Sequence, residues 1–326
     1  MQEVHLQTIL DITRGFLLND PKISKILSVS TNYADVKRGD LFIAINSSCI
    51  DEAVKRGAYA IIFDKATQIS DMEIAWIKVD NIHDCMQRLL RFFLIQYSIP
   101  IFYISLIKFD ILDLITNKKE VLTLNSLNIA TYFKQIIEKQ FKLICSNDKA
   151  LLNSIYPLHQ NFKQIIESVN FIKEGIFNCS YDFLNRHFLD LDISPMFVKD
   201  LNEILQFLDS NNIDYNLTNL KNLSHFSPIF ITKDFKQREF GQTHTVLIFE
   251  EDIELFLEEM DFLNQKASWS KRLFFHHAFK HEGIINYSSK EHLNLLLREL
   301  NFNYALIFGN RDLIEFKQEY NNYSLF

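Results

Sequence analysis

Short apolar runs alternate with amphipathic helical patterns along most of this chain, and this alternation restricts the folds open to it. In the first hundred residues the strand-like runs are ILSVST, LFIAI, AYAIIFD and IAWIKVD, at 26–31, 41–45, 58–64 and 74–80. The last hundred residues contain PIFIT, TVLIFE, RLFFH and YALIFG, with helical patterns at 252–265 and 289–300. Buried strands that alternate with amphipathic helices indicate an α/β protein with mainly parallel, doubly wound sheets.

The middle of the chain has a less regular pattern. An apolar strand at 101–105 runs into a turn and a helix, and the stretch 161–175 (NFKQIIESVNFIKEG) reads as helical. The run HFLDLDIS precedes a helix that begins near Pro195, a residue suited to a first helical turn. We therefore expect three domains, at 1–99, 100–222 and 223–326, of which the last is Rossmann-like.

Composition narrows the classes of function. Hydrophobic residues make up 48% and charged residues 23% of the 326 positions, an ordinary balance for a folded protein. The net charge of −7 and the lack of a dense basic run argue against nucleic-acid binding. The most apolar window, 89–107, contains Arg91 and Pro100 and does not fit a membrane span. The first residues do not read as a signal peptide, so we expect a cytoplasmic protein.

Glycine is scarce, with seven residues in the whole chain and no two of them closely spaced. A backbone cradle for phosphate needs closely spaced glycines, because a Cβ blocks the approach of the anion to the backbone N–H groups. Neither G-x-G-x-x-G nor G-x-x-x-x-G-K-[ST] is present. The four cysteines form no C-x-x-C pair, which favours reduced, buried thiols. We predict no bound cofactor.

Two polar clusters have simple structural interpretations. His276, His277 and His281 contain an i, i+4 pair of the kind that binds zinc on a helix, but no third ligand accompanies them, and we predict no metal site. The acidic stretch 250–261 reads as the solvated face of a helix whose apolar face is buried. The alternative interpretation places Glu250 and its neighbours at the carboxyl end of a strand, where open α/β sheets bind ligands.

The first hundred residues resemble the first domain of the Mur ligases, the ATP-dependent amide ligases of peptidoglycan synthesis. SVSTNYADVKRGDLFIAI, at 28–45, is similar to their S-x-D-S-R and V-x-x-G-D-L-F-x-A elements. DEAVKRGAYAIIFD, at 51–64, is similar to their E-A-x-x-x-G-A-x-A element, and 74–93 to the strand and helix that close the domain. The resemblance implies a UDP-binding domain, a P-loop ATPase domain, here shortened, and a Rossmann-like domain for the incoming amino acid or peptide.

The segment IPIFYISLIKFDILDLI, at 99–115, occupies the position of the family's ATP loop, I-T-G-T-N-G-K-T. Ser105 stands at a threonine of that loop, Leu106 and Phe109 replace two glycines, and Asp110 replaces the phosphate-binding lysine. Leu and Phe side chains block a loop that must wrap an anion, and an aspartate repels phosphate. Lys108 is a nearby cation, but no glycine cradle accompanies it. These residues therefore indicate a degenerate ATP loop.

The first domain also departs from the family pattern. Asn32-Tyr33-Ala34 stands where the family has Asp-Ser-Arg, and the D-G-H-x-F element is missing. The polar residues that remain as candidates for contacting a UDP-sugar are Ser30, Thr31, Asn32, Ser47 and Ser48. Their ordinary interpretation is as polar residues at strand ends and in loops.

The main hypothesis is a non-catalytic, Mur-ligase-like protein that acts by binding. Its partners would be peptidoglycan-synthesis enzymes, and its role regulation of wall synthesis or cell shape. One alternative is an active ligase or transferase with a reshaped site at the strand ends near Thr232, Glu250 and Gly309. Another is a UDP-sugar-binding protein of cell-wall metabolism, and a purely structural role is a third.

Overall fold

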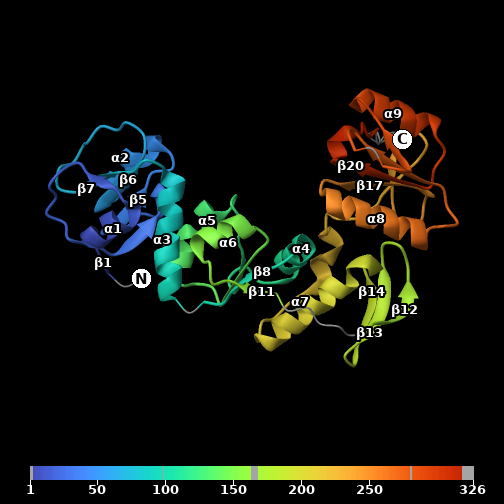
Figure 1. Ribbon diagram of the computed structural model, residues 1–326, viewed down its shortest axis with the longest axis horizontal. Helices are drawn as coiled ribbons and strands as arrows, with labels where there is room; N and C mark the ends of the chain where they lie inside the picture. The colour runs from blue at the N-terminus through green and yellow to red at the C-terminus, as the bar shows by residue number, and fades with distance from the viewer. Residues whose placement is uncertain (1–2, 98, 163–167, 280, 318–326) are drawn as a thin grey trace, which may run out of the picture. The chain divides into compact units, whose positions relative to one another are not determined.

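The computed structural model describes residues 3–97, 99–162, 168–279 and 281–317 (Figure 1). The chain divides into two compact units: Met1–Gln164 with Leu208–Tyr215, and Ile165–Phe207 with Asn216–Phe326. Both contain parallel strands joined through helices, so the predicted α/β class is confirmed.

The first sheet of unit 1 has the strand order β2-β7-β6-β5-β4. Its strands are β2 (Phe16–Leu17), β4 (Ser28–Ser30), β5 (Asp40–Ile43), β6 (Ala60–Phe63) and β7 (Ala75–Lys78). All pairs are parallel except β2 with β7. The sheet is accompanied by the short antiparallel pair β1 (Val4–His5) and β3 (Lys25–Ile26), and by α1 (Leu6–Thr13), η1 (Tyr33–Asp35), η2 (Ser47–Cys49) and α2 (Ile50–Lys55). The four predicted strands of this region are confirmed.

The second sheet of unit 1 is entirely parallel, in the order β11-β8-β10-β9. It is built from β8 (Ile101–Tyr103), β9 (Val121–Thr123), β10 (Leu143–Ser146) and β11 (Gln160–Asn161), with α4 (Leu106–Ile115), α5 (Ile129–Ile137) and α6 (Lys149–Ile155). Helix α3 (Ile82–Gln96) joins the two sheets of the unit. Its N-cap is Asn81, whose side chain accepts a hydrogen bond from the Asp84 N–H.

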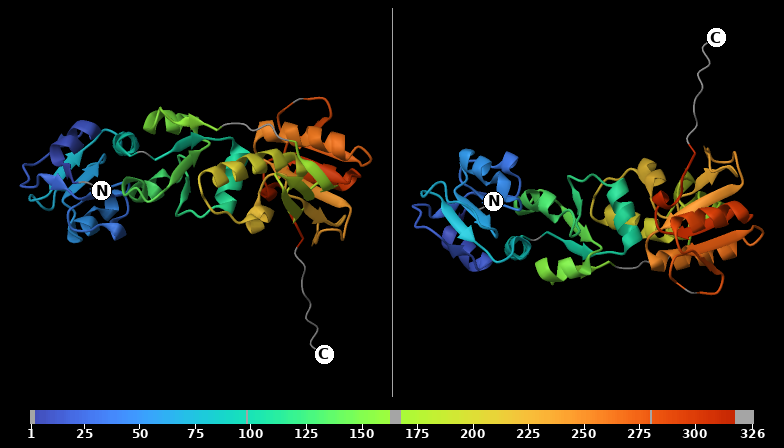
Figure 2. Two further views of the ribbon diagram at one scale, coloured as in Figure 1. Left: turned by 90° about the horizontal axis from the view of Figure 1, so that it is seen from below. Right: turned by 90° about the horizontal axis from the view of Figure 1, so that it is seen from above.

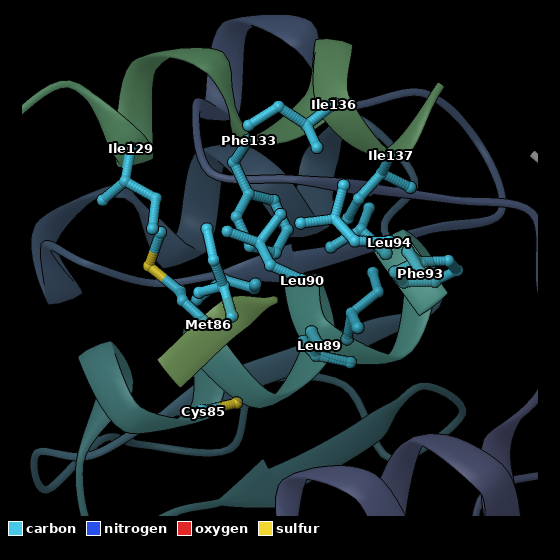
Figure 3. Close-up of a cluster of buried hydrophobic side chains, with 14 of the residues drawn as sticks. Cys85, Met86, Leu89, Leu90, Phe93, Leu94, Ile129, Phe133, Ile136 and Ile137 are labelled. Carbon is cyan, nitrogen blue, oxygen red and sulfur yellow. The ribbon is translucent and has the colours of Figure 1, made fainter. Parts of the chain in front are cut away.

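One hydrophobic core runs through both sheets of unit 1. Leu90 and Leu94 of α3 point toward Phe133 and Ile137 of α5, and all four side chains are buried (Figure 3). The apolar positions of α3 recur at the helical spacing expected from the sequence, which explains why a single helix face fills this space.

Unit 2 begins with an antiparallel sheet of β12 (Asn170–Glu174), β13 (Cys179–Phe183) and β14 (Arg186–Leu191). The helix predicted at 161–175 is therefore wrong over its last part, because pairing with β13 outweighs the local helical pattern; residues 163–167 lie outside the described residues. Helix α7 (Val198–Ser210) follows η3 (Pro195–Phe197), so the predicted helix near Pro195 is confirmed. The first part of α7 lies beside the strands of this sheet (Figure 2). The Tyr181 hydroxyl of β13 donates to Asn202 Oδ1 of α7 at 2.9 Å.

The six-stranded sheet of unit 2 has the order β16-β15-β17-β20-β18-β19. Strands β17 (Thr245–Glu250), β18 (Arg272–His276), β19 (Ile284–Asn286) and β20 (Tyr304–Phe308) are parallel, while β15 (Ile229–Ile231) and β16 (Gln237–Arg238) form an antiparallel edge. Helices α8 (Ile253–Lys266) and α9 (Lys290–Glu299) lie on opposite faces of this sheet (Figure 1). In the chain, the short helix η4 (Leu217–Asn222) precedes β15 and the short helix η5 (Arg311–Leu313) follows β20. The Rossmann-like character expected of this region is confirmed in the four parallel strands.

Candidate functional site

The strand-to-helix connection between β8 and α4 contains only two residues. Strand β8 ends at Tyr103 and α4 begins at Leu106. Ile104 N–H donates to the Ser146 carbonyl at 3.0 Å, and the Ser105 carbonyl accepts from Phe109 N–H at 2.9 Å. Ser105 is the N-cap residue, although its hydroxyl makes no capping hydrogen bond. A P-loop needs a longer glycine-rich segment here, whose N–H groups face the phosphates.

The residues that stand at phosphate-binding positions are helical in this chain. Leu106, Lys108, Phe109 and Asp110 all belong to the first two turns of α4. Phe109 is buried at 7% exposure, and Lys108 is buried to the same extent. The Lys108 ammonium lies 5.4 Å from the centroid of the Phe162 ring, within the range of a cation–π interaction. The side chain of Lys108 is therefore part of the packing of unit 1.

The five candidates for UDP-sugar contact lie at one edge of the first sheet, after the parallel strands β4 and β5. Three of them bond within the protein: Ser30 Oγ donates to the Asn32 carbonyl at 2.9 Å, Thr31 Oγ1 to the Ala130 carbonyl at 2.8 Å, and Ser48 Oγ to Asn46 Oδ1 at 3.0 Å.

Asn32 caps η1 by accepting from Ala34 N–H, and Ser47 is exposed. Lys134 of α5 donates to the Asp35 carbonyl at 2.7 Å, so α5 packs against this edge. The hydroxyls of Ser30 and Thr31 thus have structural partners already.

A histidine–carboxylate pair lies at the carboxyl end of β17. Nδ1 of His225 is 2.7 Å from Oε2 of Glu250. The other oxygen of Glu250 accepts from the N–H groups of Glu251 and Asp252, at 2.9 and 2.8 Å. Asp252 in turn caps α8 by accepting from Glu254 and Leu255 N–H. Both oxygens of the buried Glu250 carboxyl therefore have polar partners within the protein, as a buried polar group requires.

Glu259 of α8 is a second buried carboxyl close to Glu250. Its exposed fraction is 0%, and neither of its oxygens has a hydrogen-bond partner of normal geometry among the described residues. Burial raises its pKa well above the ordinary value, and the nearby Glu250 carboxyl raises it further; the Phe226 N–H acts in the opposite direction. The sequence interpretation of the acids at 250–261 as mainly a solvated face is confirmed for Glu251, Glu254, Glu258 and Asp261, which are exposed. It is wrong for Glu250 and Glu259, which are buried.

The His225–Glu250 pair lines a cleft in unit 2 that we call the His225 cleft. Two adjoining cavities, of about 570 and 420 Å³, form it and share walls made by Lys221, His225, Ser227 and Arg311. Neither the Lys221 ammonium nor the Arg311 guanidinium has a hydrogen-bonding or ionic partner within the described part of the chain. Pockets of this size with a few convergent polar groups are typical of small-ligand sites.

Two of the three strand ends proposed for a reshaped active site come together. Glu250 and Phe308 are register partners, and Gly309 N–H donates to the Glu250 carbonyl at 2.8 Å. Gly309 has a φ of +130°, and a Cβ there would lie 2.5 Å from Leu313 Cδ1, so glycine is required. Thr232 follows β15, which is antiparallel to β17. It therefore lies near the amino end of β17, whereas Glu250 lies at the carboxyl end. That part of the prediction is wrong.

The three histidines of 276–281 are not on a helix. His276 ends β18, and its Nδ1 accepts from the N–H groups of Ala278 and Phe279 at 2.9 and 2.8 Å. Burial lowers the pKa of His276, and the neighbouring His277 lowers it further. Within residues 3–97, 99–162, 168–279 and 281–317, no group of three or more His, Cys, Asp or Glu side chains has an arrangement that holds a metal ion.

None of the helices in the described ranges combines the length and the apolar character needed to cross a membrane.

The fold is thus a multi-sheet α/β architecture that ends in a Rossmann-like sheet with a polar cleft at its carboxyl edge. The chain is similar to the solved structure of MurF from Acinetobacter baumannii, with 11% identity and a TM-score of 0.49, over 96% of this chain and 97% of that one. It is similar also to the MurF ligase from Thermotoga maritima in complex with ADP, with 14% identity and a TM-score of 0.42, over 88% of this chain and 94% of that one.

A third similar structure is UDP-N-acetylmuramoyl-L-alanyl-D-glutamate–2,6-diaminopimelate ligase, at 8% identity and a TM-score of 0.37, over 94% of this chain and 93% of that one. These ligases belong to the family that the sequence motifs resemble. No protein-family model matches the sequence. No curated protein matches it either.

His225, Lys221 and Arg311 were not singled out from the sequence. His225 lies in a loop between η4 and β15, and Arg311 follows β20 by three residues. Nothing in their spacing distinguishes them from ordinary surface residues. Only the position of Arg311 after a strand of a parallel sheet marks it as a candidate for the ligand-binding edge.

Proposed function

We propose that this protein is a Mur-ligase-like binding protein that contributes to peptidoglycan synthesis or cell shape without ATP-dependent ligation. The observation that supports this most is the direct connection from β8 to α4. Ser105 both ends the connection and occupies the N-cap position of the helix, so no backbone segment is left to surround a triphosphate. Asp110 on α4 places a carboxylate where the family has a lysine, and a carboxylate repels phosphate.

The partners that fit this proposal are peptidoglycan-synthesis enzymes of the cytoplasm. A protein that keeps a ligase-like fold without its nucleotide chemistry can still present the surfaces through which related enzymes contact one another. The resemblance of the sequence motifs in the first hundred residues to those of the Mur ligases supports this choice of pathway.

The test is nucleotide binding followed by partner capture. Thermal unfolding of the purified protein with and without Mg-ATP is expected to give the same midpoint. The variant Asp110→Lys is the matched comparison, because it restores the charge of the family's lysine without restoring the loop, and it is expected to behave in the same way. A saturable upward shift of several degrees in the unaltered protein would overturn the proposal. Capture from native cytoplasm is expected to recover wall-synthesis enzymes, and their absence counts against the assigned pathway.

A second candidate function is a small-ligand transferase or ligase activity at the His225 cleft. The specific observation in its favour is the 2.7 Å contact between His225 and Glu250 beside the cations Lys221 and Arg311. A carboxylate that orients an imidazole is a recurring arrangement for proton transfer. Turnover of an acyl or phosphoryl donor that is abolished by His225→Gln and Arg311→Ala, in correctly folded variants, would favour this function over the binding role.

The UDP-sugar alternative places a ligand at the edge formed by β4 and β5. Calorimetry with a UDP-sugar tests it directly, with Ser47→Ala as the first variant because Ser47 is exposed at that edge. The hydrogen bonds that Ser30 and Thr31 already make support the prediction that no heat of binding is observed.

A further inference from the structure

Five aromatic side chains from separate segments of unit 2 line a cavity of about 630 Å³ at the amino end of β17 and β20. We call it the aromatic cavity. Its rings are Phe177 in the β12–β13 turn, Phe230 of β15, Phe240 after β16, Trp269 after α8 and Tyr304 of β20. The Phe177–Tyr304, Phe230–Phe240 and Trp269–Tyr304 centroids are 6.1, 5.2 and 6.4 Å apart.

Two of these rings are unusually exposed for their type. Trp269 is 74% exposed and Phe240 is 66% exposed. Large apolar side chains that converge on a concavity while remaining in water mark a binding surface better than scattered surface residues do. A ligand that enters the cavity therefore meets ring faces that are already assembled.

The charged groups of the cavity neutralise each other. Glu174 Oε1 accepts a hydrogen bond from the Lys266 ammonium at 2.7 Å, and both residues line the cavity. A cationic ligand held by the aromatic faces would find this carboxylate already engaged, and an anionic ligand would find the ammonium engaged. The lining thus favours an uncharged ligand.

Two polar groups at the ends of aromatic side chains lie beside the ring faces. The Tyr304 hydroxyl and the Trp269 indole N–H make no hydrogen bond to any residue that the structure describes. The Asn303 amide is occupied, since its Nδ2 donates to the His244 carbonyl at 3.4 Å and its Oδ1 accepts from Lys271 N–H at 3.0 Å. A ligand that bonds to Tyr304 and Trp269 must combine an apolar face with hydroxyl or carbonyl oxygens, because the indole N–H is a donor only.

We propose that the aromatic cavity binds the ring of an uncharged sugar. The C–H face of a sugar stacks on Trp269 and Phe240, whose electron-rich faces attract it, and the sugar hydroxyls bond to the tips of Trp269 and Tyr304. A phenylalanine side chain as ligand would stack on the ring faces but would make no hydrogen bond to the Trp269 N–H or the Tyr304 hydroxyl. This assignment stands on the lining of the cavity and is independent of the proposed function.

The two tryptophans of the chain make the test direct. Trp76 lies in unit 1 and is fully buried, so a change in emission on adding a sugar reports on Trp269. The probes are the disaccharide of N-acetylglucosamine and maltose, each titrated into the full chain. The expected result is a saturable change in tryptophan emission with at least one probe. This change is expected to be absent from Trp269→Phe, for which calorimetry measures sugar binding instead.

Variants then locate the site. Trp269→Ala is expected to weaken sugar binding about tenfold, the effect of losing about 1.4 kcal/mol of stacking. Tyr304→Phe keeps the ring and removes the hydroxyl, and it is expected to weaken binding about threefold to tenfold. The control is Leu295→Ala, an exposed apolar residue of α9 outside the cavity, which is expected to bind as the unaltered chain does.

Three outcomes would overturn the assignment. One is the absence of binding by both sugars up to their solubility limits. Another is equal affinity in the unaltered chain and in a folded Trp269→Ala variant. The third is tighter binding of tetramethylammonium or of toluene than of either sugar, since each of these shares only the ring-face contact.

Discussion

The imidazole of His225 and the carboxylate of Glu250 form a contact of 2.7 Å in which the two side chains are 12% and 2% exposed. The residues are 25 positions apart in the sequence, and the contact joins the loop before β15 to the carboxyl end of β17. It thereby fixes one wall of the His225 cleft.

Removing the carboxylate of this pair is expected to destabilise unit 2. Glu250→Ala removes the carboxyl that contacts the His225 imidazole and accepts from the N–H groups of Glu251 and Asp252, and breaking a buried pair costs about 3–5 kcal/mol. Urea unfolding measures the loss. Glu251→Ala is the matched control, because Glu251 is exposed, and its expected effect is within about 0.5 kcal/mol. Equal effects of the two substitutions would contradict the structural role of Glu250.

Glu259 is expected to make stability fall as pH rises. Its folded-state pKa lies above the ordinary value of 4.5, so between those two pKa values the folded protein binds more protons than the unfolded chain. The free energy of unfolding then decreases with increasing pH, by at most about 1.4 kcal/mol per pH unit from this one group.

Glu259→Gln imitates the protonated carboxyl and is expected to remove this contribution. Thermal midpoints of the unaltered protein and the variant, measured from pH 5 upward, give the comparison. The difference in stability between them should widen in favour of the variant as the pH rises. Parallel pH profiles would show that Glu259 does not titrate in that range.

Phe109 is expected to behave as a core residue and not as a loop residue. Phe109→Ala removes a ring that is 7% exposed in α4, which costs about 3–5 kcal/mol for a buried phenylalanine. Leu127→Ala is the control within the same unit, since Leu127 is 92% exposed and its truncation should have little effect. Denaturant unfolding separates the two. A loss below about 1 kcal/mol for Phe109→Ala would show that this turn of α4 is loosely held.

The cysteines are expected to differ in reactivity. Three of the four, Cys85, Cys145 and Cys179, are buried, whereas Cys49 is half-buried. Burial raises the pKa of the Cys85 thiol to about 12 and that of Cys179 to about 11, and it raises the pKa of Cys145 as well. The thiolate is the reactive form, so Cys49 should react first with a disulfide reagent at neutral pH. Cys49→Ser is expected to suppress the fast phase, and a fast phase that survives this change would contradict the prediction.

The fold was predictable where local pattern and burial agree. Strands β17 and β18 have the bounds that their apolar runs predict, because fully buried parallel strands leave little choice of residue. Strand β12 was not predictable from its own residues. Its five residues are all exposed, and only pairing with β13 makes this segment a strand.

The candidate site was predictable only in part. The position of Glu250 at a strand end follows from the sequence, but the arrival of His225 beside it depends on the path of a loop that has no pattern of its own. The direction of β15 was also beyond sequence reasoning, because short apolar strands read alike in parallel and antiparallel sheets. This explains why Thr232 lies at the amino end of β17 and not beside Glu250 and Gly309, as predicted.

Phe177 forms part of the wall of both the His225 cleft and the aromatic cavity, and its ring also contacts Phe226 at 5.3 Å. A molecule that shifts this ring from one side changes the shape offered to a molecule on the other side. Thermodynamic linkage makes such an influence mutual: each occupant alters the affinity of the other by the same factor. A shared aromatic partition would thus let ligands in the two cavities influence each other without movement of the backbone.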